Sequence, residues 1–134
     1  MRKIFTALTV GLLAMVLSGC GANPGTSDTD YAAKYKAAVE SLAHVAAVDA
    51  SYKSAGGMGR SADVFMYADT SDRETMMGVL RDAFPAVVDA AAGDPEVNLA
   101  IQVISADGAS AVSPADLGYS GTGSLSSYRT FLGK

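Results

Sequence analysis

The sequence predicts an α+β fold: a two-layer sandwich with about four mostly antiparallel strands and two helices on one face of the sheet. Two observations lead to this class. Segments with apolar residues at spacings of three and four, which are typical of helices, are interspersed with segments in which apolar and polar residues alternate singly, as in half-buried strands. The order is helix, strand, strand, helix, strand, strand. It approaches a ferredoxin-like arrangement but has no strand before the first helix.

The first predicted helix follows a short polar stretch, and two strands follow it. Tyr31, Tyr35, Ala38 and Leu42 fall on one helical face. The segment 45–54 then places Val48, Ala50 and Tyr52 on one strand face, with Asp49, Ser51 and Lys53 on the other. The segment 62–69 reads as a second strand. The glycine-rich connection between the two segments favours an antiparallel hairpin.

The second predicted helix has the strongest pattern. Ser71, followed three residues later by Glu74, offers a capping box. Apolar residues then recur at three and four up to Gly93, a good terminator; they are Met77, Leu80, Phe84, Val87 and Ala91. Pro85 lies within the helix and removes one of its backbone hydrogen bonds.

The remaining chain predicts a strand over 97–105 and a hairpin at Asp107-Gly108, followed by a short edge strand. The tail is mostly turn-like. Near its end, Leu125, Tyr128 and Phe131 predict one or two amphipathic helical turns.

Two aromatic residues are candidate binding residues. If Val64 and Met66 face the helices, then Phe65 and Tyr67 face the opposite way, because side chains alternate along a strand. Ala100, Gln102 and Ile104 would share this second face, which is a candidate contact surface for a partner or a second copy of the chain. The alternative is that the aromatic tail folds over this face and covers it.

Catalytic and metal sites are not apparent in the sequence. His44 is the single histidine and lies at the end of the first predicted helix. Histidine is favourable near the C-terminus of a helix, so this position accounts for the residue without a catalytic or metal-binding role. Calcium-loop spacing is missing, and Cys20 is the single cysteine. The stretch Gly118–Gly123 lacks the last glycine of a nucleophile elbow. We therefore expect no catalytic residue, no metal and no cofactor.

The N-terminus has the features of a secretory signal. Arg2 and Lys3 precede the apolar run 4–17, which is 14 residues long. A membrane-spanning helix needs about 20 residues, so a transmembrane anchor is the weaker interpretation.

The run ends in Leu17-Ser18-Gly19-Cys20, which resembles the lipobox of bacterial lipoproteins. The resemblance covers residues 1–20. It implies that the Cys20 sulfur receives a diacylglyceryl group, that a peptidase cleaves before Cys20, and that the acylated residue (palmitate is one such acyl group) becomes the first of the mature chain. An alanine-rich composition with few lysines fits a bacterium with a GC-rich genome, such as an actinobacterium.

These features divide the chain into a signal peptide (1–19), a lipidated tether (20–29) and a single domain (30–134). Without Arg2 and Lys3, eight basic residues remain against fourteen acidic ones, a net charge of −6. Anionic membrane lipids and nucleic acid repel such an acidic domain. The acyl chains on Cys20 would therefore be its only attachment to the membrane.

The expected function is a non-enzymatic, lipid-anchored binding module on the extracytoplasmic side of the cell membrane. Its partner is a protein, an envelope component or a second copy. A small-ligand sensor or carrier and an envelope enzyme are the alternatives.

Overall fold

The structure is a computed structural model, and it describes residues 27–134 except 56 and 58. Its elements follow the order α1 (Asp28–Val39), β1 (Val45–Lys53), β2 (Ser61–Ala68), α2 (Arg73–Ala90), β3 (Asn98–Ile104), β4 (Ala111–Val112), the 3-10 helix η1 (Pro114–Leu117) and α3 (Leu125–Leu132). Among these described residues, no helix has the length and apolar character needed to span a membrane.

The strands form one mixed sheet in the order β1-β2-β3-β4. β1 and β2 pair antiparallel, β2 and β3 pair parallel, and β3 and β4 pair antiparallel. The parallel pair follows from the connection through α2, because parallel neighbours need a long crossover. The two-layer α+β class is thus confirmed. This strand order does not confirm the ferredoxin-like variant.

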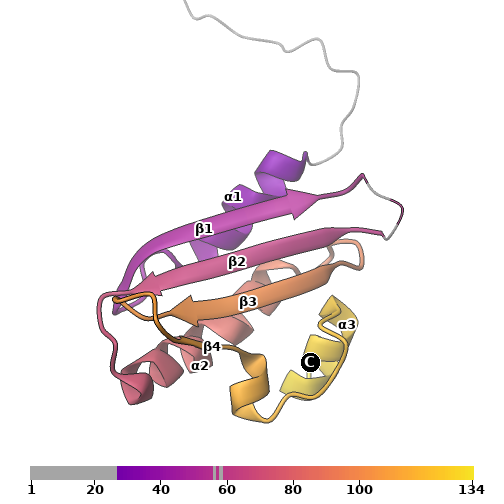
Figure 1. The fold of residues 1–134 in the computed structure, drawn as a ribbon. Coiled ribbons are helices and arrows are strands. Elements are labelled where there is room, and N and C mark those ends of the chain that lie inside the picture. Colours follow the sequence, from indigo (N-terminus) through magenta and orange to yellow (C-terminus); the bar gives the residue numbers. More distant parts are fainter. Residues whose placement is uncertain (1–26, 56, 58) are drawn as a thin grey trace, which may run out of the picture.

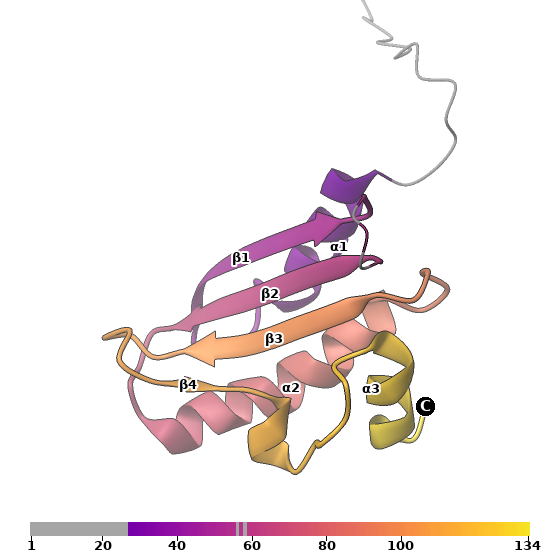
Figure 2. The ribbon, with the colours of Figure 1, turned by 45° about the vertical axis from the view of Figure 1, so that its right-hand side comes forward.

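The helices α1 and α2 lie behind the sheet in Figure 1, whereas α3 lies beside β3. Figure 2, turned by 45°, shows α3 in the helical layer next to α2. The tail therefore does not fold over the outer face of the sheet. The alternative in which its aromatics cover that face is wrong, because they pack against α2 instead.

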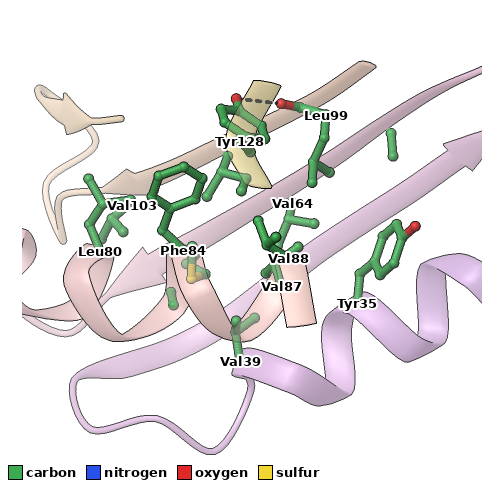
Figure 3. Close-up of a cluster of buried hydrophobic side chains, with 14 of the residues drawn as sticks. Tyr35, Val39, Val64, Leu80, Phe84, Val87, Val88, Leu99, Val103 and Tyr128 are labelled. Carbon is green, nitrogen blue, oxygen red and sulfur yellow. Dashed lines mark hydrogen bonds between the residues drawn. The ribbon is translucent and has the colours of Figure 1, made fainter. Parts of the chain in front are cut away.

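The core lies between the sheet and the helices (Figure 3). Phe84 of α2 is fully buried, and its ring meets the Tyr128 ring of α3 edge-on at 4.8 Å. The Tyr128 hydroxyl donates to the Leu99 carbonyl of β3 over 2.7 Å. These contacts attach the last helix to both layers, because Tyr128 reaches α2 and β3 together.

Element ends differ from the expectation in two places. α1 begins at Asp28, with a reciprocal capping box between Ser27 and Asp30, but it ends at Val39. Leu42 and His44, expected on the first helix and at its end, therefore lie in the turn that follows it. The cap of α2 is Asp72, not Ser71, so the predicted Ser71–Glu74 capping box is wrong. The Asp72 carboxylate accepts from the Thr75 backbone N–H at 2.9 Å, which satisfies an otherwise unpaired donor of the first turn.

Candidate functional site

The outer face of the sheet is the candidate contact surface. Val64 and Met66 are fully buried against the helices, and Phe65 and Tyr67 point the other way. Phe65 is half-buried, and Tyr67 is 40% exposed. No described helix covers this face, which is turned toward the viewer in Figure 1. The two aromatics therefore lie on an open sheet face, as their alternation predicted.

The strand register places the apolar side chains of this face in one row across the sheet. Tyr67 pairs with Ala47 on one side and with Ile104 on the other, and Ile104 pairs with Ala111. We call these four residues, Ala47, Tyr67, Ile104 and Ala111, the apolar row. Each is exposed or half-buried. Side chains directly opposite each other lie about 5 Å apart, so the row is a continuous strip.

Polar side chains border the apolar row on one side. In the next row, Phe65 stands between Asp49 and Gln102. In the row after that, Asp63 accepts a hydrogen bond from Ser51 at 3.2 Å. An apolar row with a polar border resembles the anatomy of a protein interface, in which an apolar centre lies beside a polar rim. The sequence pattern did not identify Ala47 and Ala111, although both have the parity of this face in their strands.

A surface groove of about 610 Å³ runs along the β3 edge, between β3 and the segment 113–123. Its lining combines Asp63 and Gln102 of the open face with Ile101, Tyr119 and the Ser120–Gly123 turn. The groove is therefore continuous with the polar side of the open face. No feature of the sequence predicted it, because it is formed by a loop that leaves the sheet.

The groove contains an unpaired piece of strand edge at Ile101. The Leu99 N–H donates to the Gly123 carbonyl over 2.8 Å, and Val103 pairs with Val112. Ile101 has the same parity, so its peptide groups face the same edge. Its partner position in the β4 register is Pro114, which has no N–H and begins η1. In the described chain, the β3–β4 ladder has only two residue pairs and does not reach Ile101.

His44 lies in a tight turn with φ of 67° between α1 and β1, three residues before Ala47 of the apolar row. Its Nδ1 is 3.0 Å from the Asp69 carboxylate, and both side chains are about half exposed. A carboxylate in this position can orient a histidine as a general base. Nucleophilic catalysis also requires a hydroxyl or thiol within hydrogen-bond reach of that histidine. Among the residues the structure describes, no hydroxyl is hydrogen-bonded to His44, and no group of three metal-ligating side chains is found.

Cys20, the predicted lipidation site, lies outside the described residues. The chain matches no family model, and the comparisons with curated proteins and with solved structures find no significant match.

Proposed function

We propose that this protein is a lipid-anchored, extracytoplasmic binding module that acts without catalysis and contacts a protein partner through the open sheet face. The observation that carries the proposal is the apolar row around Tyr67, which lies on a sheet face that no described helix covers. The lipobox at Leu17–Cys20 supports the location. Lipoprotein modification supplies at least two acyl chains, enough for stable attachment.

The partner is a protein, because the face offers an aromatic centre with polar neighbours in place of an enclosed cavity. Exposed tyrosines contribute strongly to protein interfaces, since a large rigid ring is buried at small entropic cost. The carboxylate of Asp63, two residues before Phe65 on the same strand face, favours a partner that brings a hydrogen-bond donor or a cation to that side.

Photo-crosslinking in the native cell tests this proposal. A photoreactive phenylalanine at Tyr67 is expected to capture a defined protein, and the same residue at Ile104, in the same row, is expected to capture the same one. The control position is Lys36 on the exposed side of α1. Tyr67→Ser should abolish capture from Ile104, whereas Lys36→Ser should leave it intact. Equal labelling from Tyr67, Ile104 and Lys36 would refute the contact surface.

A small-ligand carrier is the second candidate, and the groove at Ile101 favours it. An unpaired N–H and C=O on one strand edge can bind a ligand that carries an acceptor next to a donor, such as an amide. Native mass spectrometry of the purified full chain separates the two functions: a carrier retains a small mass adduct, which Tyr67→Ser does not remove.

A further inference from the structure

β1 is an edge strand with nine residues, and in the described chain it pairs on one side only. A long edge strand presents a row of unpaired N–H and C=O groups, which can pair with another chain. The outer side of β1 is therefore a candidate pairing edge, defined by the N–H and C=O groups that point away from β2.

The hydrogen bonds of the inner strands determine which peptide groups face outward. The Asn98 N–H of β3 donates to the Arg60 carbonyl, so even-numbered residues of β2 direct their peptide groups toward β3. The odd-numbered residues of β2 then face β1. Since Asp49 pairs with Phe65 in that register, the odd-numbered residues of β1 face β2.

The peptide groups of Val48, Ala50 and Tyr52 consequently point away from the sheet. Ser54 has the same parity and provides an independent check. Its N–H donates to the Asp28 carboxylate of α1 at 3.2 Å and not to β2. The outer edge of β1 thus offers three residues for pairing and ends where Asp28 occupies the next donor.

The side chains on the open face of β1 are complementary to themselves in one antiparallel register. If two copies pair around Ser51, then Ala50 and Tyr52 exchange backbone hydrogen bonds with their counterparts in the second copy. Asp49 of each copy then lies opposite Lys53 of the other, twice in the interface. Both side chains are exposed, and opposite charges directly across two strands stabilise the pairing. A register centred on Ala50 places Asp49 opposite Ser51 and loses both ion pairs.

We propose that the outer edge of β1 binds a second copy of this chain, antiparallel and centred on Ser51, which joins two sheets into one of eight strands. The interface is isologous, because the same strand serves both copies. It uses the edge of the sheet and not the apolar row, so each subunit of the dimer presents its own row to a partner.

A cysteine at Ser51 tests both the pairing and its register. In the proposed dimer, Ser51 lies directly opposite Ser51 of the second copy. These two residues exchange no backbone hydrogen bonds, and the Cα atoms of such a pair are about 4.5 Å apart. This separation is within the range of a disulfide. Mild oxidation of the full chain carrying Ser51→Cys, in native membranes, is expected to give a disulfide-linked dimer.

Asp63→Cys is the matched control. Asp63 lies on the same face one strand further in, and both changes remove the same Ser51–Asp63 hydrogen bond. The unaltered chain, with Cys20 alone, reports any background. Crosslinking of Ser51→Cys no greater than that of Asp63→Cys would overturn the proposal. So would a wild-type chain that stays monomeric in detergent at every concentration measured.

A charge exchange tests the proposal without any crosslink. Asp49→Lys alone and Lys53→Glu alone place like charges opposite each other twice, and each should weaken the dimer about tenfold or more. The double variant, Asp49→Lys with Lys53→Glu, should restore it. An equal mixture of the two single variants should form mixed dimers in preference to either homodimer, measured by native mass spectrometry. A mixture that shows no such preference contradicts the register, and circular dichroism verifies that each variant is folded.

Discussion

Three tyrosines of the core have hydroxyls in different environments. Tyr35 donates to the Asp94 carboxylate at 2.9 Å, and Tyr128 donates to the Leu99 carbonyl at 2.7 Å. The Tyr52 hydroxyl is buried and has no hydrogen-bond partner in the described chain, although its ring stacks on Tyr31 with 4.4 Å between centroids. All three have a raised pKa, and burial, which disfavours the charged phenolate, is the main cause.

The raised tyrosine pKa values predict a loss of stability in alkali. Burial raises the pKa of Tyr128 to about 12, so between its unfolded pKa of about 10 and this value the folded state holds the proton that the unfolded state has lost. The stabilisation is complete below about pH 10 and disappears as the pH rises to about 12. For Tyr128 alone the loss is about 2–3 kcal/mol.

Urea unfolding of the wild type and of Tyr128→Phe, at steps from about pH 9 to about pH 12, measures this loss. The variant should be less stable than the wild type by about 1 kcal/mol at the lower pH, because the Leu99 carbonyl loses its partner. As the pH rises the gap should close and then reverse. If the free energies of unfolding of the two proteins differ by the same amount at every pH in this range, then Tyr128 has the same pKa in the folded and unfolded states.

At the scale of elements, α3 belongs to the core even though the tail sequence is turn-like. Leu125 is fully buried, and the Arg129 guanidinium donates to the Ala91 carbonyl at the end of α2 over 2.8 Å. The Leu125 N–H donates to the Val97 carbonyl, which continues the β3 edge. The last helix therefore closes both the helical layer and one end of the sheet.

Truncating Leu125 should be strongly destabilising. Leu125→Ala is expected to lower the free energy of unfolding by about 2–5 kcal/mol, the usual cost of a cavity at a fully buried leucine. Leu132→Ala is the matched control, because the same change is made in the same helix at a half-buried position. Its cost should be less than half as large, measured by urea unfolding at neutral pH. Equal losses at the two positions would mean that α3 docks loosely.

The elements could be predicted from the sequence wherever periodicity alone determines them. The faces of β1 and β2, the long α2 helix and the hairpin at Asp107-Gly108 follow from local patterns. The cap of α2 could not be chosen, because Ser71 and Asp72 are both good caps. Ser71 accepts from the Asp107 N–H at 3.3 Å, a contact between residues 36 positions apart.

The candidate site divides in the same way. Phe65 and Tyr67 could be placed on the open face by alternation, whereas the groove, the neighbour of His44 and the position of the tail depend on contacts between distant segments. Asp69 reaches His44 across 25 residues, and Tyr128 reaches Leu99 across 29. Such pairings are set by how the layers pack, which a local pattern does not specify.

At the scale of the whole molecule, the two faces of the sheet differ in what they carry. The helical side holds the core, the outer side presents the apolar row, and the groove lies along the β3 edge between them. Residues 27–134 hold eight basic and fourteen acidic side chains, and this net charge of −6 gives the domain no electrostatic attraction to anionic lipid. If the domain is to work at a membrane, the attachment must come from the N-terminal segment.

Cys20→Ser tests this attachment. The wild-type chain is expected in the membrane fraction of the native cell, to remain there through a wash in about 1 M salt, which screens ionic contacts, and to leave only with detergent. Cys20 should carry a diacylglyceryl group as the first residue of the mature chain, measured by mass spectrometry of the N-terminal peptide.

The Cys20→Ser chain has no site for the lipid, so it is expected to leave the membrane fraction. Should its membrane-bound fraction equal that of the wild type, the apolar run 4–17 would be the anchor, and the lipid would be dispensable. Lys134→Ser, a change of one charge at the opposite end of the chain, is the control and should leave the distribution as it is in the wild type.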